Sequence, residues 1–205
     1  MGRKSKRRKI PGPPGPKHFA LRKAGKVVVA TRGGAISELM DCAIWMWFLE
    51  QTPLSIHVLV MAAYQCLEDL GKETGQGPTL KAKMGADKFA TYYDYLRHSS
   101  GNKATGLDFP PAFNGPIIFD AALAFQRIFD GYITAAMLAF VAYFAIIRPG
   151  IDPADFPESP ESYAGKLLPK GITLEEIRTI DRMEAYDRLT KLFEAQSGVS
   201  HIKSP

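Results

Sequence analysis

Apolar residues recur at helical spacing along most of this chain, beginning near residue 35. Over residues 35–51 they fall on one face of a 3.6-residue wheel, while Ser37, Glu38 and Asp41 lie off that face. The apolar face comprises Ile36, Leu39, Met40, Ala43, Ile44 and Trp47. This pattern predicts a first amphipathic helix.

A second helix is predicted from Pro53 to about Lys72. Thr52 is a residue type that caps helices, and proline is favoured at the first helical position. Gly71 and Gly75 are stop signals. The helix carries one narrow polar stripe with Met61 among its members, made of His57, Gln65, Glu68 and Lys72. The rest is apolar, which predicts the most enclosed helix of a bundle.

Three more helical segments follow before residue 150. The first is broken near Gly85 and ends around His98, after which residues 99–116 form a long loop. Helices are then predicted over 116–129 and 132–147. The 132–147 segment has no charged residue, but a bilayer-spanning helix needs about 20 apolar residues. We therefore expect a buried core helix and no membrane contact, with membrane attachment as the weaker alternative.

The last helix has the clearest start in the chain. Thr173 and Glu176 form a capping box, and Ile172 with Ile177 supplies a hydrophobic staple. Over 174–196 the apolar residues recur at every third position, so in one continuous helix their stripe winds around the axis. These residues are Leu174, Ile177, Ile180, Met183, Tyr186, Leu189 and Leu192. One core covers only one side of such a helix, so we expect a homodimer in which this helix takes part.

The fold class predicted from these patterns is all-α, a bundle of about five to six helices. Strand signals are confined to residues 26–31, which we interpret as a strap laid on the helices. The predicted organisation is a disordered basic tail, a helical core, a Pro-rich connector and a C-terminal helix, over residues 1–24, 25–150, 151–172 and 173–205 respectively.

Positive charge is concentrated at the N-terminus. Residues 1–37 hold 11 of the 26 Lys and Arg residues and no acid, which leaves 15 Lys and Arg against all 21 acids in the rest. The densest run comprises Arg3, Lys4, Lys6, Arg7, Arg8 and Lys9. Such a tail is typical of contact with RNA or DNA phosphates. An anionic surface, or a purely solubilising role, are the alternatives.

Metal and cofactor chemistry finds little support in the sequence. The four histidines, His18, His57, His98 and His201, show no ligand spacing, and the chain has no CxxC pair and no phosphate-binding loop. We expect no metal and no cofactor. Cys42 and Cys66 lie in apolar helical patterns, which favours free thiols in a reducing compartment. With no signal-peptide pattern at the start, we expect a cytoplasmic protein.

Four polar residues are candidates for function. Arg97 and His98 end a helix beside a polar loop, where an arginine could bind phosphate and a histidine could transfer a proton. Together they suit metal-independent RNA cleavage, although cations at a helix C-terminus also simply offset its dipole. His57 either faces a polar groove or is hydrogen-bonded in the core. Lys72 is predicted to pair with Glu68 at i, i+4 or to contribute to the same groove.

The second helix carries a sequence resemblance. It resembles a group of uncharacterised bacterial helical proteins in three stretches, which are Pro53-Leu-Ser-Ile-His57, Ala62-Ala-Tyr-Gln65 and Leu70-Gly-Lys72. That group has an S-I-H-T-L-x-x-A-A helix, a K-H-A-D helix end and an L-D/E-F loop. Arg97-His98 and Leu107-Asp-Phe109 are the counterparts of the last two here, so the resemblance spans about residues 35–125.

More distantly, the run Leu67-Glu-Asp-Leu-Gly-Lys72 resembles the helix end of abortive-infection proteins related to HEPN domains. The resemblance implies a helical bundle, often dimeric, associated with RNA or with defence. HEPN ribonucleases carry a histidine four to six residues after an arginine, whereas here His98 follows Arg97 directly. The functional hypothesis is therefore a HEPN-like, RNA-associated module. The alternative is a noncatalytic dimeric regulatory protein that binds nucleic acid through its tail.

Overall fold

The computed structural model describes residues 31–85, 89, 108–148, 168 and 171–197, and every regular element in these ranges is a helix. The elements are α1 (Arg32–Phe48), α2 (Pro53–Thr74), α3 (Leu80–Met84), the short 3₁₀ helix η2 (Pro111–Phe113), α5 (Asn114–Ile128), α6 (Ala135–Ile147), α8 (Leu174–Thr179) and α9 (Arg182–Ser197). The prediction of an all-α bundle is confirmed. The predicted tail lies outside the described residues, as do all of the strap except Thr31 and nearly all of the connector.

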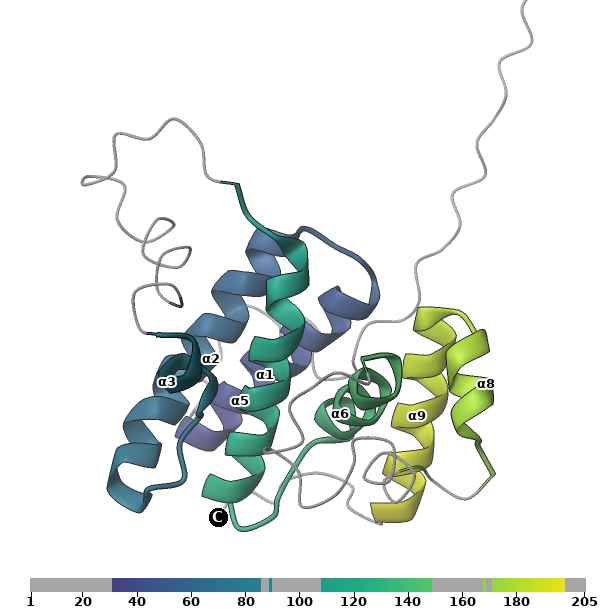
Figure 1. The fold of residues 1–205 in the computed structure, drawn as a ribbon. Coiled ribbons are helices and arrows are strands. Elements are labelled where there is room, and N and C mark those ends of the chain that lie inside the picture. The colour runs from purple at the N-terminus through teal and green to yellow at the C-terminus, as the bar shows by residue number, and fades with distance from the viewer. Residues whose placement is uncertain (1–30, 86–88, 90–107, 149–167, 169–170, 198–205) are drawn as a thin grey trace, which may run out of the picture.

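The helices are arranged around α6 (Figure 1). Helices α1, α2 and α5 pack together, with α2 in contact with both others. Helix α6 lies against α1 and α5 on one side and against α8 and α9 on the other. Nine of its thirteen residues are buried, and its sequence is apolar all round, as expected of a helix enclosed by neighbours. Within the described ranges no helix is both long and apolar enough to cross a membrane.

Side chains and glycines set several of the helix ends. The Thr31 hydroxyl accepts a hydrogen bond from the Gly34 N–H at 3.1 Å, which starts α1 three residues earlier than the apolar pattern predicts. Helix α2 begins at Pro53 as predicted, but the Thr52 side chain makes no capping hydrogen bond. At its other end Gly75 has a φ of 71°, a left-handed conformation that favours glycine.

The prediction that the second helix is the most enclosed one is wrong. Eight of the 22 residues of α2 are buried, against ten of the 15 residues of α5. Helix α2 packs on α1 and α5 and turns another face outward, where Leu54 and Val58 are about two-fifths exposed, at 39% and 41%. A long apolar sequence was therefore not a sign of complete burial.

The predicted single C-terminal helix is two helices. The first, α8, ends at Thr179, and Ile180 is extended, with φ −79° and ψ 160°. The Asp181 carboxylate then accepts hydrogen bonds from the Met183 and Glu184 N–H groups and starts α9. Because the axis changes at this break, the apolar residues before and after it face the same core, and both helices contact α6. The winding stripe therefore gives no support to the predicted homodimer.

Other features of this region agree with the prediction. The Thr173 hydroxyl accepts a hydrogen bond from the Glu176 N–H at 3.2 Å, which is one of the two bonds of the predicted capping box, while the Glu176 carboxylate pairs with Arg188. Ile172 and Ile177 are buried, as expected of the staple. The predicted break near Gly85 is also present, since this residue ends α3 with a φ of 87°.

An aromatic cluster fills the junction of α1, α6 and α9. The Trp47 ring lies edge-on to Phe140 with a centroid distance of 4.9 Å, and Phe48 packs on Tyr186 at 4.8 Å. Phe140 in turn stacks on Phe144 at 5.3 Å. This cluster joins helices that lie far apart in the sequence, so it fixes the relative position of the two ends of the fold.

Candidate functional site

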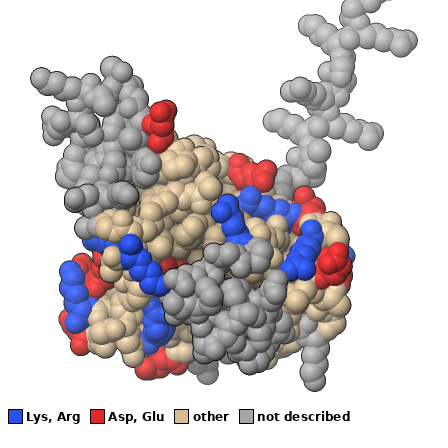
Figure 2. All heavy atoms as spheres, viewed as in Figure 1, with Lys and Arg blue, Asp and Glu red and all other residues tan. Residues whose placement is uncertain are grey.

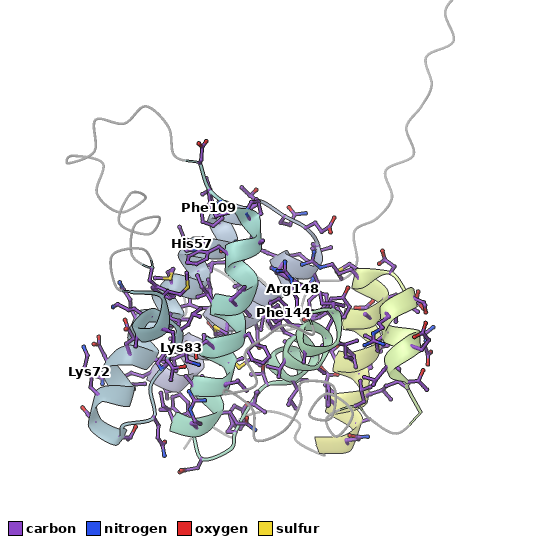
Figure 3. All side chains as sticks on the ribbon, viewed as in Figure 1. His57, Lys72, Lys83, Phe109, Phe144 and Arg148 are labelled. Atoms are coloured by element: carbon purple, nitrogen blue, oxygen red, sulfur yellow. The ribbon has the colours of Figure 1, made fainter. Side chains whose placement is uncertain are left out.

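The predicted site residues do not form one cluster within the part of the chain that the structure describes. Arg97, His98 and the six basic residues of positions 3–9 lie outside it. His57 and Lys72 both lie on α2, but at opposite ends (Figure 3). Fifteen residues of helix separate them, or about 22 Å at 1.5 Å per residue. The two side chains therefore do not meet at one point of the structure.

His57 is a core histidine. Its side chain is fully buried, and its Nδ1 lies 3.0 Å from Oδ1 of Asn114, the first residue of α5. The imidazole also packs on the Phe109 ring at a centroid distance of 4.9 Å (Figure 3). Asn114 donates from Nδ2 to the Pro53 carbonyl at 2.8 Å. The pair ties the first turn of α2 to the first turn of α5.

The hydrogen bonds of Asn114 fix the histidine tautomer. Because Nδ2 of Asn114 donates to Pro53, its Oδ1 is the atom facing His57 and must accept. Nδ1 of His57 therefore carries the proton. Burial lowers the pKa of His57, while the hydrogen bond to Asn114 acts in the opposite direction. A neutral, enclosed imidazole of this kind holds two helices together.

Lys72 makes a surface ion pair, but not the predicted one. Its Nζ lies 2.7 Å from Oδ1 of Asp69, three residues earlier, and both side chains are well exposed. The neighbouring carboxylate of Glu68 pairs instead with Lys81 of α3 at 3.0 Å. The pairing with Asp69 raises the pKa of Lys72 and lowers that of Asp69. Exposed pairs contribute little to stability, so Lys72 has a minor structural role.

Among the described residues, the most extensive buried polar cluster is centred on Asp120, which the helical patterns did not single out. Its carboxylate accepts hydrogen bonds from the Tyr64 hydroxyl at 2.8 Å, from the Thr79 N–H at 2.9 Å and from the Leu80 N–H at 2.8 Å. The Tyr64 hydroxyl itself accepts from the Lys81 N–H at 3.1 Å. Asp120 of α5 thus caps α3 from a distance, where Thr79 makes no cap of its own.

This cluster suits a structural role. The Asp120 carboxylate accepts from four donors, which are the Tyr64 and Thr79 hydroxyls and the Thr79 and Leu80 N–H groups. Burial, together with the nearby Asp120 charge, raises the pKa of Tyr64. A phenol that holds its proton so strongly is a poor acid. The sequence did contain a signal, since Asp120 is the one charged residue in the otherwise apolar run 115–125. An acid in such a run is usually buried with partners.

A second carboxylate joins α1 to α6. Thr134 donates from its hydroxyl to Oδ1 of Asp41 at 2.6 Å and accepts from the Met137 N–H at 3.1 Å, so it also caps α6. Burial raises the pKa of Asp41 to about 7, opposed by the Thr134 hydrogen bond and assisted by the Glu38 charge. Asp41 and the buried Ser37 are therefore not simple surface residues of α1.

Arg182 joins the start of α9 to the end of α1. Its guanidinium lies over the Trp47 ring at 3.3 Å from the centroid, and it pairs with Glu50 at 3.1 Å. Glu50 has a φ of 53°, so the chain turns sharply after α1 at this point. Stacking of arginine on tryptophan is a favourable cation–π arrangement. This contact stabilises the docking of α9.

Taken together, the described polar clusters use their groups to join helices: His57 joins α2 to α5, Asp120 joins α5 to α3, and Asp41 joins α1 to α6. In the same ranges, no group of three or more His, Cys, Asp or Glu side chains is placed to hold a metal ion. Comparison with known proteins adds no assignment, because no family model, no curated protein and no solved structure matches the chain.

Proposed function

We propose that this protein is a nucleic-acid-associated helical module whose basic N-terminal segment contacts the phosphate backbone. The observation that carries the proposal is the separation of charge along the chain. Residues 1–37 hold 11 Lys and Arg residues without a single acid, whereas acids outnumber bases in the remainder, 21 to 15. Clustered cations bind nucleic acid by releasing counterions from it, and this needs no defined pocket.

The charges of the folded part also favour the basic N-terminal segment, and not the bundle, as the part that contacts phosphate. Several of its described cations pair with acids, as in Lys72–Asp69, Lys81–Glu68 and Arg182–Glu50, and in Arg188 with both Glu176 and Glu184. On the face shown in Figure 2 blue and red side chains are interspersed. Where it is drawn in colour, this face therefore presents phosphate with mixed charge and not with a continuous positive surface. The segment free of acids is therefore the better candidate for the contact.

The buried polar groups of the described bundle favour a structural role over a catalytic one. His57, Asp120 and Tyr64 are enclosed and joined to helix ends by hydrogen bonds, where they stabilise the bundle. A general base must instead lie within reach of a substrate proton. We accordingly propose a bundle that acts as a scaffold, in the cytoplasm, where RNA is abundant.

The HEPN-like hypothesis is the catalytic alternative. It assigns RNA cleavage to Arg97 and His98, and the polar Arg97-His98-Ser-Ser sequence favours it. Incubating full-length protein with a labelled RNA in excess EDTA tests it. Cleavage that is lost in both Arg97→Ala and His98→Ala, while helicity is unchanged, would establish the alternative. Intact RNA, together with binding, supports the noncatalytic proposal.

The proposal itself is tested by a charge-neutralised tail. The variant replaces the densest basic run with glutamine, at Arg3, Lys4, Lys6, Arg7, Arg8 and Lys9. We expect the affinity for a fluorescent single-stranded RNA, measured by anisotropy, to fall by at least about tenfold. Lys72→Gln combined with Lys191→Gln is the matched control on the folded part, and it should bind as the wild type does. Equal binding by the tail variant and the wild type would refute the proposal.

A further inference from the structure

The outward side of α2 carries a row of uncharged residues. Leu54, Val58, Ala62 and Cys66 follow one another at four-residue intervals, so they form a single ridge along about 18 Å of helix. Leu54 and Val58 are 39% and 41% exposed, Cys66 is exposed, and Ala62 is half-buried. We call these four residues the α2 ridge. It faces away from α1 and α5, on which α2 packs with its other side.

The ridge is unusual for a helix surface in contact with water. From Pro53 to Leu67 the helix has no Lys, Arg, Asp or Glu, and the one histidine of this stretch is buried. The exposed side of α9, in contrast, carries Glu184, Arg188 and Lys191. A solvent-facing helix normally resembles α9, whereas a contiguous uncharged face is typical of a surface that binds a partner.

The geometry of the ridge suits a second copy of the same helix. A ridge at i, i+4 spacing packs into the matching groove of another helix, which is the commonest mode of helix packing. The small side chain of Ala62 lies midway between Leu54 and Leu70, so two copies can approach closely there. We propose that the α2 ridge is a homodimer interface, in which two α2 helices cross antiparallel with Ala62 at the two-fold axis. The contact is then self-complementary.

Charge complementarity supports the antiparallel direction. The first turn of α2 contains no acidic residue, and the Thr52 side chain does not cap it. Asp69 is exposed, where it also pairs with Lys72 at 2.7 Å, and it lies seven residues after Ala62, while Ser55 lies seven residues before Ala62. An antiparallel crossing at Ala62 therefore brings Asp69 of each copy to the first turn of the other. A negative charge is favourable at a helix N-terminus. A parallel crossing would instead place the two Asp69 side chains together.

Disulfide trapping in the full-length protein tests both the face and the direction. In the antiparallel crossing, Ala62→Cys in a Cys66→Ser background places two thiols at the axis, so mild oxidation should yield mostly crosslinked dimer. Native Cys66 should not crosslink, because the two Cys66 positions would be about 12 Å apart along the helices, beyond disulfide reach. Lys191→Cys in the Cys66→Ser background, on α9, is the matched control and should stay monomeric on a nonreducing gel.

Sedimentation gives a second readout that does not depend on cysteine chemistry. We expect the wild type to be dimeric at tens of micromolar and Val58→Asp to be monomeric with unchanged helicity by circular dichroism. A monomeric wild type would overturn the proposal, and it would indicate that another segment of the same chain covers the ridge. Efficient crosslinking through native Cys66 would overturn the antiparallel crossing. A dimer that survives Val58→Asp and does not trap through position 62 would overturn the choice of face.

Discussion

Thr134 donates a hydrogen bond of 2.6 Å to the carboxylate of Asp41, and this contact joins the N-terminus of α6 to the middle of α1. Helix α6 is enclosed by the rest of the bundle, so few polar contacts position it. The raised pKa of Asp41, about 7, means that the folded protein holds a proton there which the unfolded chain, with an ordinary value of 3.8, releases.

The sign of the resulting pH dependence follows directly. Proton uptake by the folded state stabilises it fully below pH 3.8, and this contribution is lost as the pH rises to about 7. Asp41→Asn keeps an acceptor for Thr134 without a charge. The variant should therefore be more stable than the wild type at pH 8, by on the order of 1–3 kcal/mol. The advantage should shrink towards pH 4, as measured by urea unfolding at each pH, and an advantage independent of pH would contradict this account.

His57 should have the opposite dependence. Burial lowers its pKa from the ordinary value of 6.5, so the unfolded chain binds a proton more readily than the folded one. Its contribution is present above pH 6.5 and is lost as the pH falls through that value towards the lower folded pKa. His57→Leu costs about 1–3 kcal/mol at pH 7, because Asn114 loses its donor. The difference between wild type and variant should shrink by at most about 2 kcal/mol between pH 7 and pH 5. A constant difference would exclude this role.

Asp120 should be the most important buried carboxylate for stability. Removing it in Asp120→Ala leaves the Tyr64 hydroxyl and the Thr79 and Leu80 N–H groups without their acceptor. We expect a loss of about 3–5 kcal/mol in the free energy of unfolding. Tyr64→Phe removes one of these bonds and should cost about 1 kcal/mol. Hydrogen exchange at Leu80 should accelerate in the alanine variant. If the two variants are equally stable, Asp120 is not the centre of the cluster.

Much of this fold follows from the sequence, and the exceptions share a cause. Helix positions, the Thr173 cap and the Gly85 break depend on neighbours within a few residues, and pattern alone predicted them. The break between α8 and α9 depends on Asp181 capping a new helix and on α6 lying beneath both. Asp120 was missed for the same reason, since its partners lie 40 and 56 residues away. A lone acid in an apolar run indicates a buried carboxylate, but the sequence carries no signal for which distant groups that carboxylate contacts.

The backbone of Gly71 lies close to that of Gly77, and this contact predicts that alanine at position 71 destabilises the protein. Helix propensity alone would predict that the same substitution stabilises it. A Cβ on Gly71 would lie 2.2 Å from the Gly77 Cα and 2.4 Å from its N, and backbone atoms cannot move aside as a side chain can. Alanine is the better helix former by about 1 kcal/mol, yet we expect Gly71→Ala to destabilise the protein by at least about 2 kcal/mol.

Gly75→Ala is the matched control for that substitution. A Cβ at this position would meet no atom within 4 Å, but the φ of 71° is unfavourable for alanine. We expect a cost of about 1 kcal/mol. Thermal unfolding of both variants compares the steric effect of a Cβ at position 71 with the conformational effect of alanine at position 75, four residues later. Gly71→Ala should have the lower midpoint, and the reverse order would contradict the close approach of Gly71 and Gly77.

The central claim, that the basic N-terminal segment contacts phosphate, is tested most directly by the salt dependence of RNA binding. For single strands the plot of log Kobs against log salt has a slope of about −0.7 per phosphate contact. Neutralising Arg3, Lys4, Lys6, Arg7, Arg8 and Lys9 should therefore make the slope of the full-length protein shallower by up to about four. The Lys72→Gln and Lys191→Gln control should keep the wild-type slope. A tail variant with an unchanged slope would contradict the claim.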